Sequence, residues 1–121
     1  MTDPQVLGRD GEDSAVVFLR KNGYKILHRN WKSGKKEIDI VAESGDFIVF
    51  VEVKTRSGRF LSEASVTVPK DKQRLLLLAA ESYIQRYNVN KESRFDIVTI
   101  VTNGKTEEIE HTVDAFYPTL R

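Results

Sequence analysis

The sequence of 121 residues contains no cysteine, two histidines and three prolines. The absence of cysteine excludes disulfide scaffolds, zinc–thiolate centres and cysteine nucleophiles. Two histidines, His28 and His111, are too few for a histidine-rich metal centre. Any bound metal is therefore expected to have oxygen ligands, which favours Mg²⁺ or Mn²⁺.

Long apolar segments are also missing. The longest uninterrupted apolar run is Leu75–Ala80, which we expect to be core, whereas a membrane-spanning helix needs about 20 such residues. Residues 1–10 carry charge and lack the apolar segment of a signal peptide. We therefore expect a cytoplasmic protein without a membrane association.

The residues that are present have the composition of a globular protein, with 40% hydrophobic and 31% charged residues. A chain of this length fits one domain with a single sizeable core. We place that domain at residues 8–118 and expect residues 1–7 to form a flexible N-terminal arm.

The formal net charge of +1 conceals an uneven distribution. Residues 20–36 and 54–59 are rich in lysine and arginine and contain no acid, whereas residues 96–121 hold five acids against two bases. Clustered basic residues are typical of phosphate binding, although a solvated charged face gives the same pattern. The nucleic-acid-binding candidates, from these segments and from the first turn of a following helix, are Arg29, Lys32, Lys35, Lys36, Arg56, Arg59, Lys72 and Gln73.

Apolar periodicity predicts two helices and five strands. The helices are expected at residues 9–21 and 69–87, and the strands at 24–32, 37–44, 47–55, 94–102 and 105–111. Asn22-Gly23 should end the first helix, and Asn103-Gly104 should join the last two strands in a hairpin. The order αβββαββ predicts an α/β fold with a mixed central sheet.

The most informative segment is Glu37-Ile-Asp-Ile, followed thirteen residues after Asp39 by Glu52-Val-Lys54. Glu52 and Lys54 share one face of their strand, about 7 Å apart along it. A two-residue turn at Gly45-Asp46 would pair residue 44 with residue 47. That register, which a four-residue loop would also give, places Asp39 opposite Glu52 and Glu37 opposite Lys54; a three-residue loop would turn Asp39 to the other face.

Two facing carboxylates repel each other unless a positive charge lies between them. We therefore predict that Asp39 and Glu52 are catalytic metal ligands, and that Lys54 orients or deprotonates water or stabilises charge on a phosphate oxygen. Glu12, on the inward stripe of the first helix, is a further candidate ligand, although the helix dipole alone also favours a glutamate there. The plainer alternative for the strand residues is a polar face of an edge hairpin, for which Phe47–Lys54 is too apolar.

These residues resemble the PD-(D/E)XK nuclease superfamily, whose signature is an aspartate, a following Glu-x-Lys and often an acid on the first helix. Asp39, Glu52, Lys54 and Glu12 match this signature in order and element type. Over about residues 7–117 the chain is similar to the YraN-like family of small bacterial proteins, which in turn resembles archaeal Holliday-junction resolvases. Further segments that carry this similarity are Gly23-Tyr24-x-Ile26-Leu27-x-x-Asn30-Trp31, Val49–Arg56 and Arg94-Phe-Asp96.

The resemblance implies a restriction-endonuclease-like fold, a Mg²⁺ site that includes the backbone carbonyl of Val53, and structure-selective cleavage of DNA. It also implies a homodimer, because paired cuts need two sites. The leading hypothesis is thus a Mg²⁺- or Mn²⁺-dependent endonuclease acting on DNA, including branched DNA. The alternatives are a non-catalytic nucleic-acid-binding module on the same fold, and a protein-interaction domain that uses its acidic C-terminal region. Asp96 either faces the same site or pairs with an arginine.

Overall fold

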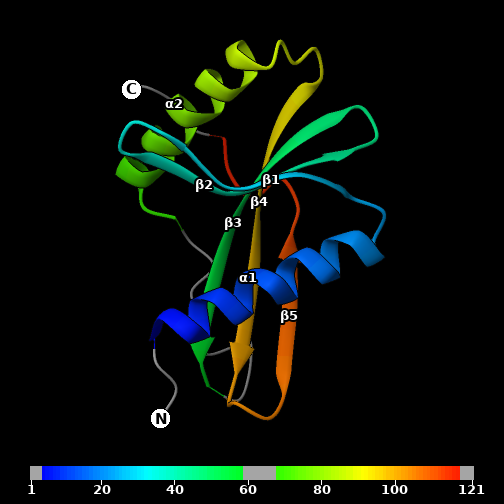
Figure 1. Cartoon of the computed structure of the whole chain (residues 1–121), viewed down its shortest axis with the longest axis vertical. Helices are drawn as coiled ribbons and strands as arrows, with labels where there is room; N and C mark the ends of the chain where they lie inside the picture. Colours follow the sequence, from blue (N-terminus) through cyan, green and yellow to red (C-terminus); the bar gives the residue numbers. More distant parts are fainter. Residues whose placement is uncertain (1–3, 59–67, 118–121) are drawn as a thin grey trace.

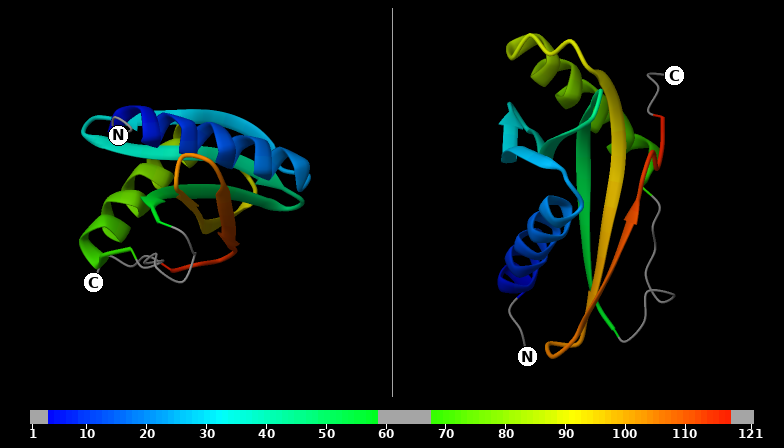
Figure 2. Two further views of the ribbon diagram at one scale, coloured as in Figure 1. Left: turned by 90° about the horizontal axis from the view of Figure 1, so that it is seen from below. Right: turned by 90° about the vertical axis from the view of Figure 1, so that its right-hand side faces the viewer.

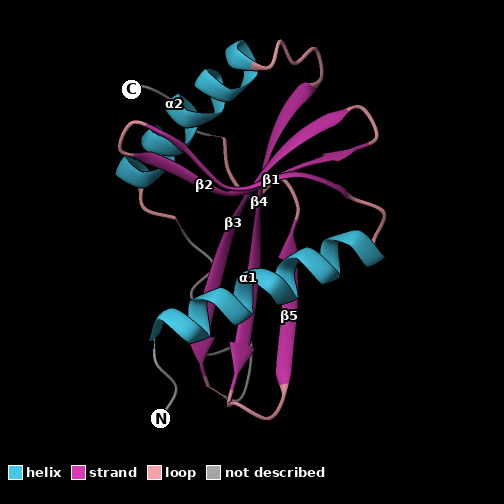
Figure 3. Cartoon of the chain, in the orientation of Figure 1, coloured by secondary structure: helices cyan, strands magenta, loops and turns pink. Residues whose placement is uncertain are grey.

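The computed structural model describes residues 4–58 and 68–117. Its elements, in chain order, are α1 (Pro4–Lys21), β1 (Lys25–Ser33), β2 (Lys36–Ser44), β3 (Phe47–Ser57), α2 (Lys70–Arg86), β4 (Glu92–Thr102) and β5 (Glu107–Thr112). The strands form one sheet in the order β1-β2-β3-β4-β5, in which β3 and β4 are parallel and the other neighbouring pairs are antiparallel (Figures 1 and 3). The predicted αβββαββ order with a mixed sheet is confirmed.

The two helices cover opposite faces of the sheet (Figure 2). Since side chains alternate along a strand, β3 contributes Val49 and Val51 to the core beneath α1, and Ile48 and Phe50 to the core beneath α2. The helix α1 packs against β1, β3 and β4, and α2 packs against β1 and β2. Burial on both faces explains why β3 is nearly continuous in apolar residues. Neither described helix is long and apolar enough to cross a membrane.

The start of α1 differs from the prediction. It begins at Pro4 rather than at residue 9, so residues 4–7, which were assigned to the N-terminal arm, are helical; residues 1–3 lie outside the described part of the chain. Proline is well tolerated in the first turn of a helix because no intrahelical bond is needed from its nitrogen. The helix ends at Lys21 as predicted, where Gly23 adopts a φ of +87° and the Tyr24 N–H bonds to the Leu19 carbonyl over 3.0 Å.

The hairpin between β4 and β5 has a longer loop than predicted. Thr102 pairs with Glu107, so β5 begins at residue 107 instead of 105. The side-chain oxygen of Asn103 accepts hydrogen bonds from the backbone N–H groups of Lys105 (2.8 Å) and Thr106 (2.9 Å). This side-chain bonding stabilises a four-residue loop.

The hairpin of β1 and β2 separates from β3 partway along its length. The predicted register is confirmed from Ser44↔Phe47 to Ile40↔Val51, where the ladder between β2 and β3 ends. Beyond that point β2 continues with β1, through Ile38↔Trp31 and Glu37↔Lys32, and bends away from β3 (Figure 1). The expected pairing of Glu37 with Lys54 is therefore wrong, and Asp39 lies at the fork between the two strands.

Close packing of α1 on β3 depends on Gly11. A Cβ atom at residue 11 would lie 2.0 Å from Oγ1 of Thr55 and 3.1 Å from the Thr55 Cβ and Cγ2 atoms. Because the neighbouring residue Glu12 is carried by the same turn, this contact also sets the position of its carboxylate relative to the sheet.

We expect Gly11→Ala to lower the free energy of unfolding by about 1–3 kcal/mol, because overpacking outweighs the better helix propensity of alanine. Urea denaturation measures this change. The double variant Gly11→Ala/Thr55→Ala should recover part of the loss, since it removes the nearest atom of the clash. A Gly11→Ala protein as stable as the parent would contradict the close approach.

Candidate active site

A pocket of about 230 Å³ lies at the fork between β2 and β3, against the start of α2. It is lined by residues from the β1–β2 turn, β2, β3 and α2, namely Lys35, Lys36, Glu37, Asp39, Glu52, Lys72, Leu75 and Leu76. The structure thus brings Asp39 and Glu52 into one pocket, together with three of the predicted basic residues. Their proximity was predicted from the register. From α2, Lys72 and Gln73 were predicted to bind nucleic acid, and of these two Lys72 lines the pocket.

Asp39 occupies the position at which the ladder between β2 and β3 stops. Its Oδ2 atom accepts a hydrogen bond of 2.8 Å from the backbone N–H of Val53. Burial and the nearby charge of Glu52 raise the pKa of Asp39 to about 7, whereas the Val53 N–H opposes the shift and the charge of Glu12 adds to it. Asp39 is therefore a carboxylate that needs a positive charge nearby in order to be ionised at low energetic cost.

Glu52 lies on the face of the sheet that α2 covers, since its strand neighbour Phe50 belongs to that core. Its side chain is buried and forms an ion pair with Lys72 in the first turn of α2. Lys72 was predicted to bind nucleic acid, and the structure places it inside the carboxylate pocket. The sequence offered no signal for this particular pairing, because it depends on how α2 packs.

Asp39 and Glu52 fit a hard divalent cation. Their oxygens are the ligand type that Mg²⁺ prefers, and Mg²⁺ commonly uses one or two carboxylates together with water and substrate phosphates. The N–H and C=O groups of a strand residue project to the same side, so the Val53 carbonyl lies on the edge that faces Asp39. Within residues 4–58 and 68–117, no group of three or more histidine, aspartate or glutamate side chains could hold a metal ion. The charge of Glu12 contributes to the raised pKa of Asp39, and its role as a further ligand stays a prediction.

Lys54 follows Glu52 by two residues and shares its face of β3. Partial burial and the positive charge of Arg56 lower the pKa of Lys54, and the charge of Glu52 opposes this shift. A lowered pKa increases the fraction of lysine that is a neutral amine at a given pH, and a lysine must be neutral in order to accept a proton.

The basic candidates differ in where the structure places them. Lys35 and Lys36 line the pocket from the β1–β2 hairpin, whose turn uses Gly34 with a φ of +62°. Arg29 forms an ion pair of 2.6 Å with Asp13, and Lys32 is exposed on β1. Arg59 lies outside the described residues.

The remaining candidates make local contacts with the backbone. The Arg56 guanidinium donates to the Thr55 carbonyl over 2.9 Å. The Gln73 side chain donates to the Val68 carbonyl over 2.8 Å, while its backbone N–H bonds to the Pro69 carbonyl. Gln73 thus closes the first turn of α2 and does not itself line the pocket.

Leu75 and Leu76 were missed as pocket residues because the run Leu75–Ala80 was assigned to the core. The structure buries Leu76, Ala79 and Ala80 but leaves Leu75 51% exposed. Six consecutive residues of a helix project in every direction, so they cannot all face the sheet. The apolar side chain of Leu75 therefore lies at the mouth of a charged pocket.

Asp96 is not part of this pocket. It is buried and accepts hydrogen bonds from Arg94 (2.9 and 2.8 Å) and from the backbone N–H of Asp114 (2.9 Å). Its Oδ2 atom also lies 2.7 Å from Nε2 of His111. Its ladder partner Val51 faces α1, so Asp96 lies on the face opposite Glu52. Burial alone would raise the pKa of Asp96, but the hydrogen bonds of His111 and Arg94 hold it below its ordinary value. The open alternative is thus settled in favour of pairing with an arginine.

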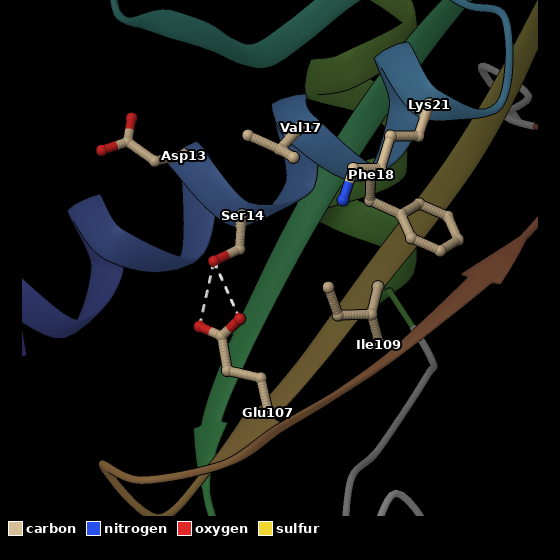
Figure 4. Close-up of a pocket in the computed structure, with 7 residues that line it drawn as sticks. All are labelled: Asp13, Ser14, Val17, Phe18, Lys21, Glu107 and Ile109. Atoms are coloured by element: carbon tan, nitrogen blue, oxygen red, sulfur yellow. Dashed lines mark hydrogen bonds between the residues drawn. The ribbon is translucent and has the colours of Figure 1, made fainter.

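A larger pocket of about 370 Å³ lies between α1 and β5 (Figure 4). Its lining residues are Asp13, Ser14, Val17, Phe18, Lys21, Glu107 and Ile109. Ser14 donates to both carboxylate oxygens of Glu107, at 2.9 and 3.0 Å, so this carboxylate is already satisfied. We place the candidate active site in the smaller pocket because two carboxylates and several ammonium groups converge there.

Comparisons with known proteins identify relatives over nearly the whole chain. The model of a family described as "Uncharacterised protein family UPF0102" matches residues 11–100. A UPF0102 protein of Bacteroides fragilis is 40% identical over 120 residues, which cover 99% of both chains. A UPF0102 protein of Flavobacterium psychrophilum is 42% identical over 117 residues, 97% of this chain and 98% of the relative. One from Nitratidesulfovibrio vulgaris is 39% identical over 110 residues, 90% of this chain and 82% of the relative.

The raised pKa of Asp39 predicts that its charge destabilises the protein when no cation is bound. As the pH rises, the unfolded chain loses this proton first, so stability should fall between about pH 4 and pH 7 and then level off. In EDTA, Asp39→Asn should be more stable than the parent by roughly 1–3 kcal/mol at pH 8 and nearly equal to it at pH 4. Chemical denaturation at both pH values measures the difference, and Asp46→Asn, in the exposed β2–β3 turn, is the control. Equal differences at both pH values would contradict the shift.

Asp96 should behave in the opposite way. Its lowered pKa means that its ionised form stabilises the fold above about pH 4, and that this contribution is lost as the pH falls below the unfolded value. Asp96→Asn should cost about 3 kcal/mol at pH 7, because Arg94 loses its buried counter-charge. The geometry also predicts that Asp96→Asn leaves any Mn²⁺ binding at Asp39 and Glu52 unchanged, as measured by paramagnetic broadening of amide signals. Loss of Mn²⁺ binding in a folded Asp96→Asn protein would place Asp96 in the metal site.

Proposed function

This chain belongs to the uncharacterised protein family UPF0102, the YraN-like family that its motifs indicated, and we propose that it is a metal-dependent nuclease that hydrolyses phosphodiester bonds in DNA. The proposal places it in the PD-(D/E)XK nuclease superfamily, whose signature residues it resembles. Mg²⁺ or Mn²⁺ would be the cofactor, held by Asp39, Glu52 and the carbonyl of Val53.

The observation that carries the proposal is the meeting of Asp39 and Glu52 at the fork between β2 and β3. Asp39 is half-buried, its pKa is raised by burial and by Glu52, and its described hydrogen bond comes from one backbone N–H. A protein that needed only a stable fold would gain nothing from two adjacent carboxylates, one of them buried and the other half-buried. A divalent cation that bound both would remove their repulsion.

The chain's own residues supply the rest of the chemistry. A bound divalent cation would neutralise charge on the scissile phosphate and favour ionisation of water. Lys54, on the same face as Glu52, would orient the attacking water or accept its proton, and would then stabilise the negative charge that develops as water oxygen bonds to phosphorus and the bond to the leaving oxygen breaks. The lowered pKa of Lys54 supports the proton-accepting role.

The surroundings of the pocket favour a nucleic acid as substrate. Lys35 and Lys36 reach the pocket from the β1–β2 hairpin, and Lys32 is exposed on the strand that leads to it. These ammonium groups would hold phosphates that flank the cleaved bond. If the substrate is branched DNA, as the resemblance implies, paired cuts require two sites, and a homodimer would supply them.

One observation favours a non-catalytic binding module as the second candidate. Lys72 already neutralises Glu52, so one of the two carboxylates has a partner without any metal. In that case Lys72 and Glu52 would form a structural ion pair within a DNA-binding surface. Variants of Asp39 or Lys54 would then bind DNA with unchanged affinity, both in EDTA and in Mg²⁺.

The test is cleavage of linear, flap and four-way-junction DNA in Mg²⁺ or Mn²⁺, with EDTA as the blank. Asp39→Asn should abolish cleavage yet bind DNA in EDTA at least as well as the parent, because it removes a negative charge beside the phosphate. Lys54→Ala should bind nearly normally and cut on the order of 10²-fold more slowly. Lys105→Ala, in the exposed β4–β5 loop, is the matched control and should cut at the parent rate.

Two outcomes would count against the nuclease. A parent protein that binds DNA but cuts none of these substrates with either metal would favour the binding module. Cleavage at the parent rate by both Asp39→Asn and Lys54→Ala would assign the activity to a contaminant or to another site.

A further inference from the structure

Glu52 has a positive partner of its own, the ammonium of Lys72 in the first turn of α2. The two side chains differ sharply in their surroundings, because Glu52 is 7% exposed whereas Lys72 is 52% exposed. A carboxylate this buried is costly without a compensating charge. A half-exposed lysine, by contrast, can turn its ammonium to water at little cost. The ion pair is therefore required by Glu52 and dispensable for Lys72.

A divalent cation and the ammonium of Lys72 would compete for Glu52. Asp39, which is half-buried, and Glu52, which is buried, line the pocket together with Lys35, Lys36 and Glu37 from the hairpin. The positive charge of Lys72 also acts on Asp39. A cation with two positive charges would balance the charges of Asp39 and Glu52, and would repel the ammonium at short range.

We propose that Lys72 is an internal counter-ion that occupies the cation position of Glu52 and that a divalent cation displaces. This inference rests on the proposed metal site but concerns a different property, namely what holds the pocket together before the cation arrives. Lys72 is then a positioning residue: it keeps the buried carboxylate ionised and the start of α2 in place, and it gives up that role on metal binding.

Displacement would also change how the protein meets DNA. The released ammonium belongs to the first turn of α2, beside the pocket that would receive a phosphate, so it becomes available as a phosphate contact. Metal binding and DNA binding would then be coupled, and by thermodynamic reciprocity each would strengthen the other.

The decisive experiment measures Mn²⁺ affinity by isothermal titration calorimetry in the absence of nucleic acid. Lys72→Met should bind Mn²⁺ about tenfold more tightly than the parent, because it removes both the competitor and its repulsion. The matched control is Lys70→Met, an exposed lysine of the same helix turn that does not line the pocket, and its affinity should stay within about twofold of the parent.

Thermal unfolding in EDTA tests the ion pair independently of affinity. Lys72→Met should lower the Tm in the parent background, but should have little effect in a Glu52→Gln background, where no buried charge remains to be compensated. Added Mn²⁺ should raise the Tm of Lys72→Met by more than it raises that of the parent. If Lys72→Met does not fold, Lys72→Gln, which keeps hydrogen-bond donors without the charge, takes its place in both measurements.

The outcomes separate this inference from the proposed function. Equal or weaker Mn²⁺ affinity in Lys72→Met, beside a parent that binds Mn²⁺, would overturn the counter-ion role and leave the metal site intact. Binding in Lys72→Met but not in the parent would support the inference in its strongest form. Absence of Mn²⁺ binding in both proteins would overturn the inference and the proposed metal site together.

Discussion

The repulsion between the carboxylates of Asp39 and Glu52 is the constraint that β2, β3 and the start of α2 must accommodate. Glu52 is buried and Asp39 is half-buried at the point where β2 leaves β3, and each carboxylate has a different partner. Asp39 accepts the Val53 N–H, which the departing strand leaves without a ladder partner, and Glu52 pairs with Lys72 from α2. The fork in the sheet and the N-terminus of α2 thus border the same pocket.

Close contacts support this fork from both faces of the sheet. On one side Gly11 lets α1 approach β3 closely, and on the other the side chain of Gln73 closes the first turn of α2. The parallel pairing of β3 with β4 runs the full length of β3, so Glu52 and Lys54 project from a strand that is held by its neighbour throughout. A rigid strand fixes the separation of two charged groups better than a loop can, and catalysis by positioned charges depends on that precision.

A second buried carboxylate, Asp96, shows how environment assigns different roles to the same residue type. Asp96 is surrounded by donors from Arg94, His111 and the backbone of Asp114, which hold its pKa down and make it a structural anchor for β5. Asp39 has one described donor and a like charge nearby, which raise its pKa. The first arrangement is complete within the protein, whereas the second would be completed by a cation, and that difference distinguishes a structural group from a candidate ligand.

The sequence by itself predicted the order of elements, the register of β2 on β3 from Ser44 to Ile40 and the proximity of Asp39 to Glu52, because a period of two combined with a two-residue turn gives one pairing; it did not predict that β2 leaves β3 beyond Ile40. It also predicted the end of α1 near Gly23 and the start of α2 near Pro69, because these two residues restrict how a helix can continue. Only the tertiary structure decided that Lys72 pairs with Glu52, that Asp96 lies on the opposite face and that Leu75 reaches the pocket mouth. These facts depend on how α2 and the β1–β2 hairpin pack against the sheet, and such long-range contacts are set by the shape and charge of whole elements rather than by local periodicity.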